Sequence, residues 1–299
     1  MSAVRTLVED DAEDPTKKNF YFEQTIPIPA YLIALVAGDL AEQSLGSRTS
    51  VITEPVMLAS CAAELSDLEL SLDTAEAYLT EYIWGTYTVL VLPPSFPYGG
   101  MENPLLTFAS PTIIVGDKSQ VYVATHEICH SWTGNEVTCQ NWSNMWLNEG
   151  FTVFCERAVS SELNTMDFAK TEAILGNYDM INDMTSYGFT NSYSSLYPVM
   201  NGANPDDSFS TIPYEKGFQF LVYLQSLIGE EDFQEFLRQY ITKHSLTSIE
   251  YTALESDWND YVTATQDDPQ AIIDAVDWDT WVLVPGLPPV TADFSNPDQ

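Results

Sequence analysis

Residues 126–130 read His-Glu-Ile-Cys-His, the H-E-x-x-H pattern, and Glu149 follows His130 by nineteen positions. Residues four apart lie on one face of an α-helix, so a helix here would bring both imidazoles to the same ion. A second helix beginning near Asn144 would return the carboxylate of Glu149 to them. Two histidines and a glutamate leave the fourth position of a tetrahedral zinc site open to water, which is typical of a catalytic site. The sequence therefore predicts one zinc ion per chain, held by His126, His130 and Glu149.

Glu127 is the carboxylate next to the predicted ion that does not bind it. Zinc lowers the pKa of a bound water to about 7, and an adjacent carboxylate can accept the proton. Hydrolysis with Glu127 as the general base is the chemistry that this pattern favours. The third histidine of the chain, His244, ends an amphipathic stretch, where a cation suits the helix C-terminus, so we expect it to be structural.

Hydrophobic periodicity predicts the elements around this motif. Residues 1–20 are polar and mixed, which indicates a loop or a frayed edge, whereas the apolar run 31–37 suits a buried strand. A stretch rich in Asn, Ser, Tyr and Gly, residues 176–207, is expected to be a long surface loop. Helices are expected over residues 144–163, over 213–228, where proline stands in the first turn and Gly229 follows the end, and over 230–244, where apolar residues form an amphipathic stripe.

The chain has 299 residues, of which 45% are hydrophobic and 12% aromatic. This composition indicates a folded protein. Asp and Glu number 44 against 10 Lys and Arg, which gives a net charge of −34. This charge repels phosphate backbones, so we expect no nucleic acid partner. It attracts cations, including metal ions and substrate amines, although solubility alone would also account for it.

The sequence also predicts the cellular location. The longest apolar run is far shorter than the roughly 20 residues that cross a membrane, so no membrane span is expected. The first 20 residues lack the apolar core of a secretory signal. Four cysteines without C-x-x-C spacing are expected to be reduced thiols. The expected location is cytoplasmic.

Several motifs in a fixed order carry a family resemblance. Residues 98–103 read Tyr-Gly-Gly-Met-Glu-Asn and precede the zinc motif, which is followed by Trp-Leu-Asn-Glu-Gly at 146–150. Pro-Tyr-Glu-Lys-Gly-Phe follows at 213–218. With these motifs the chain resembles the M1 family of zinc aminopeptidases, which are gluzincins, and the resemblance extends over essentially its whole length.

The resemblance implies an α+β fold in three parts. Residues 57–290 would form a mostly helical, thermolysin-like zinc metallopeptidase domain with a small mixed sheet. Residues 1–56 would be the last strands of an N-terminal β-saddle domain. Residues 291–299 would be a linker to a helical domain that this sequence does not contain.

The resemblance also implies roles for residues outside the zinc motif. Glu102 would bind the free α-amino group of the substrate, and Tyr214 would donate a hydrogen bond to the oxyanion. Asp206 matches an aspartate that, in one branch of the family, directs water onto a lipid and contacts peptides. Phe209 stands where close relatives carry a second active-site tyrosine. The strand that lines the substrate backbone would comprise Tyr98, Gly99, Gly100, Met101 and Asn103.

The activity implied is that of a zinc metallo-aminopeptidase, which removes the N-terminal residue of peptides with a free amino end. One alternative is hydrolysis of a lipid epoxide at the same zinc, with Asp206 directing the water. Another is an inactive fragment that serves only as a binding surface, because missing domains would expose apolar faces.

Overall fold

The computed structural model describes residues 1–294 of the chain. Two compact units are present: Met1–Asp73 with Tyr82–Ser131, and Thr74–Glu81 with the residues from Trp132 onward. The linker expected over residues 291–299 falls partly outside the description, since residues 295–299 are not described. The expected α+β class, mostly helical with a small mixed sheet, is confirmed.

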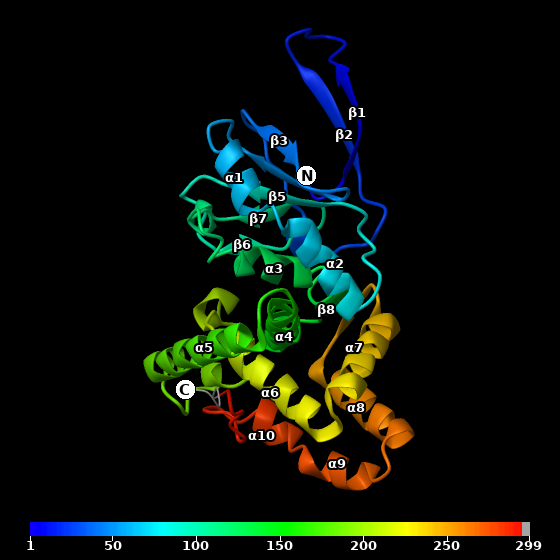
Figure 1. Cartoon of the computed structure of the whole chain (residues 1–299), viewed down its shortest axis with the longest axis vertical. Coiled ribbons are helices and arrows are strands. Elements are labelled where there is room, and N and C mark those ends of the chain that lie inside the picture. The colour runs from blue at the N-terminus through cyan, green and yellow to red at the C-terminus, as the bar shows by residue number, and fades with distance from the viewer. Residues whose placement is uncertain (295–299) are drawn as a thin grey trace. The chain divides into compact units, whose positions relative to one another are not determined.

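The first unit is built on a five-stranded mixed sheet in the order β3-β4-β5-β7-β6 (Figure 1). Parallel pairing joins β4 to β5 and β5 to β7, whereas β3 and β6 run antiparallel at the two edges. The helices of this unit are α1 (Leu58–Glu64), α3 (Tyr122–Cys129) and the start of α2 (Leu68–Tyr78). The strands are β3 (Ala41–Ser44), β4 (Thr49–Thr53), β5 (Tyr87–Val91), β6 (Gly100–Met101) and β7 (Thr107–Ala109).

A separate two-stranded ribbon lies at the N-terminus, formed by β1 (Val4–Asp10) and β2 (Lys18–Glu23). The expectation of a loop over residues 1–20 is therefore wrong, because cross-strand pairing orders this polar stretch. The buried strand expected over residues 31–37 is also wrong. This run holds a 3₁₀ turn, Ala30–Leu32, and then leaves Ile33 and Leu35 exposed.

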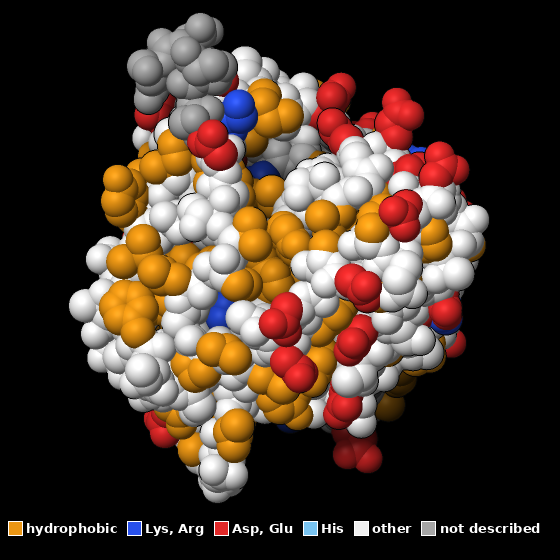
Figure 2. All heavy atoms as spheres, turned by 90° about the horizontal axis from the view of Figure 1, so that it is seen from below, with side chains coloured by type: hydrophobic (Ala, Val, Ile, Leu, Met, Phe, Trp, Pro, Cys, Tyr) orange, Lys and Arg blue, Asp and Glu red, His pale blue; other side chains and the backbone are white. Residues whose placement is uncertain are grey.

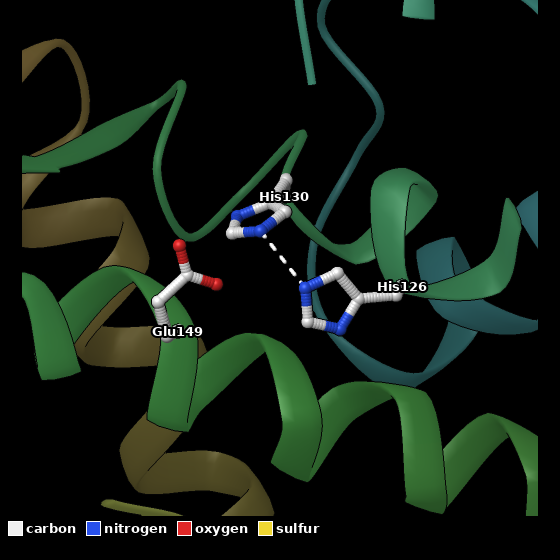
Figure 3. A group of neighbouring side chains, drawn as sticks. All are labelled: His126, His130 and Glu149. Atoms are coloured by element: carbon white, nitrogen blue, oxygen red, sulfur yellow. Dashed lines mark hydrogen bonds between the residues drawn. The ribbon is translucent and has the colours of Figure 1, made fainter. Parts of the chain in front are cut away.

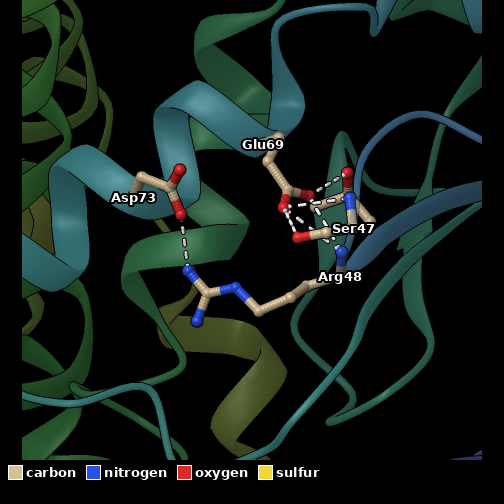
Figure 4. Close-up of polar contacts among 5 residues, drawn as sticks. Ser47, Arg48, Glu69 and Asp73 are labelled. Atoms are coloured by element: carbon tan, nitrogen blue, oxygen red, sulfur yellow. Dashed lines mark hydrogen bonds and ion pairs between the residues drawn. The ribbon is translucent and has the colours of Figure 1, made fainter.

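Glu69 ties the β3–β4 turn to α2 (Figure 4). Its carboxylate accepts hydrogen bonds from the backbone N–H and the hydroxyl of Ser47, from the N–H of Arg48 and from the hydroxyl of Thr49. Desolvation alone would raise the pKa of Glu69, but these hydrogen bonds outweigh it and lower the pKa to about 2. Arg48 also forms an exposed ion pair with Asp73 on α2, at 2.5 Å.

The second unit is almost entirely helical. A small sheet in it pairs β8 (Val137–Cys139) in parallel with β9 (Thr247–Ile249). A 3₁₀ turn, Trp142–Asn144, leads directly into α4. The helices are α4 (Met145–Leu163), α5 (Met166–Tyr187), α6 (Ile212–Ile228), α7 (Glu230–His244), α8 (Tyr251–Thr265), α9 (Pro269–Ala275) and α10 (Trp278–Val282). Further 3₁₀ turns span Ser192–Ser194 and Pro205–Ser208.

Three of these helices, α4, α6 and α7, agree with expectation, and local signals explain the bounds of α6. Pro213 lies in the first turn of α6, where its missing N–H leaves no hydrogen bond unmade, and Gly229 ends the helix with φ of 90°. Aromatic packing joins the core: Phe151 of α4 stacks on Tyr240 of α7 with ring centroids 5.0 Å apart. Phe220 of α6 stacks on Trp281 of α10 at 4.7 Å.

The loop expected over residues 176–207 is wrong in its first part, because α5 continues to Tyr187. Its buried stripe consists of small residues and methionines, Ala169, Ala173, Gly176, Met180 and Met184. Met180 and Met184 form a core cluster with Ile212 of α6. A stripe of this composition carries a weak hydrophobic signal, although its spacing is helical.

The cysteines divide into two kinds. Cys61 and Cys139 are buried free thiols, as expected. Cys129 and Cys155 are disulfide-bonded, so the expectation of four reduced thiols is wrong for these two. Disulfide formation depends on proximity in the fold, and separation along the chain does not reveal it.

The surface reflects the charge of the sequence. Figure 2 shows acidic side chains scattered over the face in view, with few basic ones and with apolar side chains between them. Within residues 1–294, no helix combines the length and the apolar character needed to cross a membrane.

Replacing Glu69 with glutamine should destabilise the first unit by roughly 1–2 kcal/mol at pH 7, because a charged acceptor forms stronger hydrogen bonds than a neutral one. The folded pKa lies below the unfolded value, so this stabilisation is present above about pH 4.5 and is lost as the pH falls toward 2. Thermal unfolding of both proteins at pH 7 and pH 3 measures the difference.

The matched control is Asp73→Asn, which removes only the exposed ion pair with Arg48 and should cost at most about 0.5 kcal/mol. A Glu69→Gln effect of equal size at both pH values would contradict the assignment of the stabilisation to the ionised carboxylate.

Candidate active site

The two histidines of the motif lie on and just after α3, and one helical turn brings their rings together. His130 caps the helix, and its N–H donates to the carbonyl of His126 at 3.1 Å. Their Nε2 atoms are 3.1 Å apart, as the dashed line in Figure 3 marks. His126 is partly exposed, whereas His130 is only 2% exposed. The i, i+4 spacing of the motif therefore acts as expected.

Glu149 lies in the first turns of α4, and polar contacts within the second unit hold this end of the helix. The Oδ1 atom of Asn148 accepts a hydrogen bond from the N–H of Cys139 at 2.8 Å. The Oδ1 atom of Asn144 accepts one from the N–H of Tyr251 at 3.0 Å. Sequence reasoning did not assign these two asparagines, which fix the start of α4 against β8 and α8.

His126, His130 and Glu149 form a group that could hold a metal ion, since their ligand atoms all lie within 4.8 Å of one another (Figure 3). Zinc binds imidazole nitrogen at about 2.0–2.1 Å, so two nitrogens on one tetrahedral ion are about 3.3 Å apart. The 3.1 Å between the two Nε2 atoms is close to this value. The donor set and its spacing thus fit zinc.

Glu127 lies on α3 between the two histidines and is only 5% exposed. It packs against the strand β6 at Gly100. A Cβ atom placed on Gly100 would lie 2.1 Å from Oε1 of Glu127, so no other residue fits there without moving the carboxylate. At Gly99 an added Cβ would meet the side chain of Val123 at an ordinary 3.6 Å. Of the two glycines, only Gly100 is required to make room for Glu127.

A second buried carboxylate, that of Glu102, lies close to the first. Ligand atoms of Glu102, Glu127 and His130 lie within 4.8 Å of one another, and Glu102 is 8% exposed. Tyr87 of β5 is buried near both carboxylates. Burial and the charges of Glu127 and Glu102 keep its pKa well above the usual value, so its phenol stays protonated. The sequence does not point to Tyr87, because its pattern there indicates only a residue of a strand.

The strand expected to line a substrate is at the edge of the five-stranded sheet. Gly100 pairs with Ala109, Met101 pairs with Phe108, and the carbonyl of Gly99 accepts from the N–H of Ser110 at 2.8 Å. The two ends of the motif differ in burial. Tyr98 is exposed and its ring packs edge-on against Phe96, whereas Asn103 is buried.

Tyr214 and Asp206 belong to the second unit. Tyr214 lies in the first turn of α6, partly buried, with its ring edge-on to that of Phe209 at 6.3 Å. Asp206 is exposed on the 3₁₀ turn Pro205–Ser208, which the side chain of Asn204 caps. The hydroxyl of Tyr187 donates to the backbone carbonyls of Asp207 and Phe209 and so fixes this turn to α5.

The sequence is similar to those of curated proteins. Leukotriene A-4 hydrolase of Xenopus laevis is 42% identical over 291 residues, which are 97% of this chain and 47% of that protein. Leucine aminopeptidase 2 of Aspergillus terreus is 42% identical over 290 residues, 95% of this chain and 46% of that protein. The chain therefore spans about half the length of the curated relatives that it matches.

The chain is also similar to solved structures. The native leukotriene A4 hydrolase of Saccharomyces cerevisiae superposes with a TM-score of 0.89 at 39% identity, covering 97% of this chain and 45% of that one. The family model described as the peptidase family M1 domain matches residues 65–281. A match over more than half of the sequence shows that this chain belongs to peptidase family M1.

Proposed function

We propose that this chain carries the catalytic site of a zinc metallo-aminopeptidase, with one zinc ion held by His126, His130 and Glu149. The observation that carries the proposal is the pair of buried carboxylates, Glu102 and Glu127, beside His130. Hydrolysis requires one of them as a base. Two carboxylates so close together repel each other, so the second favours a cation, and the free ammonium group of a peptide supplies it.

Three residues of the chain have separate roles in the proposed hydrolysis. What zinc supplies when bound is a water of pKa about 7 and a Lewis acid for the scissile carbonyl. Glu127 accepts the proton of the attacking water and returns it to the leaving nitrogen. Glu102 pairs with the substrate ammonium and thereby limits cleavage to the first peptide bond. The phenol of Tyr214 donates a hydrogen bond to the oxyanion.

The edge strand β6 supports a peptide as the substrate. Its pairing with β7 uses one side of the strand, and β6 is the last in the order of its sheet. An extended peptide binds to such an edge through main-chain hydrogen bonds. Tyr98, Gly99, Gly100, Met101 and Asn103 accordingly remain the proposed substrate-lining residues.

A second candidate function is hydrolysis of a lipid epoxide at the same zinc, with Asp206 directing the water. The name of the Xenopus relative, leukotriene A-4 hydrolase, favours it, and the exposure of Asp206 leaves its carboxylate accessible. This reaction needs no substrate ammonium.

The remaining features of the proposal concern the whole protein. We propose that residues 1–56 are the last strands of a larger β domain, and residues 57–290 the peptidase domain. The exposed apolar side chains of the N-terminal ribbon, Val4, Leu7, Phe20 and Tyr21, support this. A two-stranded ribbon is marginally stable alone, and further strands would bury these side chains. The cytoplasmic location stays a prediction.

Loss of one ligand should remove the metal. Glu149→Ala leaves two protein ligands, so the dialysed protein should retain little of the one zinc per chain that the native protein holds. Glu127→Gln is the matched control: it should keep its zinc and lose hydrolysis, because the base is gone and the ligands remain. Elemental analysis of the folded proteins measures zinc. Full zinc occupancy in Glu149→Ala would contradict the ligand assignment.

Gly100→Ala should lower kcat at least ~10-fold with zinc retained, since the new methyl group displaces the Glu127 carboxylate and small displacements of a catalytic group are costly. Gly99→Ala, whose methyl group makes an ordinary contact with Val123, is the control and should keep near-native turnover. Equal kcat values for the two variants would show that the fit between Gly100 and Glu127 has no part in turnover.

Blocking the substrate amine separates the two candidate functions. Acetylating an aminoacyl amide removes the ammonium that Glu102 would bind, and loss of such a charge pair typically costs ~2–5 kcal/mol, or at least ~30-fold in rate. Glu102→Ala should close this gap by slowing the free-amine substrate, whereas epoxide hydrolysis should be insensitive to an amine. Equal rates on free and acetylated substrates would exclude Glu102 as the amine anchor and with it the aminopeptidase assignment.

A further inference from the structure

Two helices of the second unit, α4 and α6, approach each other closely at Gly150 and Gly217. A Cβ atom on Gly150 would lie 2.8 Å from Cα of Gly217, and one on Gly217 would lie 2.9 Å from Cα of Gly150. Backbone therefore meets backbone at this crossing. Gly150 directly follows Glu149, and Gly217 lies three residues after Tyr214. The crossing thus sets the distance between the helices at the level of two site residues.

A buried ion pair joins the same two helices. Nη1 and Nη2 of Arg157 on α4 donate to the two carboxylate oxygens of Glu215 on α6, at 2.9 and 2.7 Å. Both residues are only 7% exposed. Glu215 directly follows Tyr214 in the sequence. The paired geometry of a guanidinium and a carboxylate restricts the rotation of α6 about its axis, which a single hydrogen bond would not do.

The surroundings of this ion pair are shaped to hold it. The guanidinium lies over the ring of Phe218 at 4.2 Å and donates to the carbonyl of Glu172 on α5. Burial disfavours its charge, but Glu215, Glu156 and Glu172 outweigh burial and raise the pKa of Arg157. Gly176 of α5 makes the room: a Cβ atom there would lie 2.1 Å from Oε1 of Glu215.

Stability alone does not account for such an arrangement. A well-packed apolar pair of similar volume often stabilises a core as much as a buried ion pair does. An ion pair differs in what it specifies, because its hydrogen bonds are satisfied in one orientation only. This chain has 10 basic residues, and one of them is buried here.

We propose that Arg157 and Glu215 are positioning residues, which with the Gly150–Gly217 crossing fix the first turn of α6 so that the phenol of Tyr214 is held in place relative to α4. The proposal rests on the proposed function of Tyr214 as oxyanion donor. Neither Arg157 nor Glu215 touches the substrate in it.

The test is a double-mutant cycle with a spectroscopic readout, carried out on the full chain. Arg157→Lys keeps the charge and loses the paired geometry, and Glu215→Gln is a second mild variant. Each should lower kcat on an aminoacyl anilide about 10-fold or more, with KM and zinc content unchanged. In a Tyr214→Phe background the same changes should alter kcat less than about 2-fold, because residues that act through one group are not additive.

Labelling with 3-fluorotyrosine gives a readout that needs no activity. The ¹⁹F resonance missing from Tyr214→Phe belongs to Tyr214, and in Arg157→Lys and Glu215→Gln it should shift or broaden. The control is Arg238→Lys, which loses hydrogen bonds to the carbonyls of Ala77, Tyr78 and Leu79 in the same unit. It should lower Tm and leave both kcat and the Tyr214 resonance unchanged.

The outcomes separate the two proposals. An unmoved Tyr214 resonance in both Arg157→Lys and Glu215→Gln, or equal kcat losses in the native and Tyr214→Phe backgrounds, would overturn the positioning role. A resonance that moves in a chain with no hydrolytic activity would support the positioning role and contradict the proposed function.

Discussion

The contact of Gly150 with Gly217 is the constraint on which the helical unit depends. Because neither residue has a side chain, α4 and α6 approach until their backbones touch. Trp146 of α4 then packs against Phe220 of α6, which in turn stacks on Trp281 of α10. Glu149 on α4 and Tyr214 on α6 each lie within one helical turn of this crossing. A closely packed helix pair thus carries the two side chains that we propose as zinc ligand and oxyanion donor.

The first unit holds two carboxylates, those of Glu102 and Glu127, close together. Glu127 comes from a helix and Glu102 from the residue after an edge strand, so sheet pairing sets one position and helix geometry the other. Gly100, which has no side chain, leaves room for the carboxylate of Glu127. Because the nearby phenol of Tyr87 stays protonated, it adds no third negative charge to the group.

The parts of this structure that were predictable are those with a strong local signal. The H-E-x-x-H spacing fixes a helix and the meeting of two imidazoles, and the aromatic stripe of α7 gives its bounds. The second part of α5 was not predictable in this way, because its buried face uses Gly176, Met180 and Met184. The run 31–37 failed for the opposite reason: it is apolar in sequence, but Ile33 and Leu35 remain exposed. The ion pair of Arg157 with Glu215 joins residues that are 58 positions apart, so no local sequence pattern predicts it.

The shortage of basic residues has a consequence for the solution behaviour of the chain. Arg157 and Lys216 are buried, so they do not offset the acidic surface that Figure 2 shows. Mutual repulsion of the remaining carboxylates then opposes the compact state, and its range is set by the ionic strength. At 0.15 M ionic strength, dissolved salt largely screens the repulsion between exposed charges that are more than about 8 Å apart. Added salt should therefore stabilise this fold, whereas in a protein stabilised mainly by surface ion pairs the same screening weakens the native state.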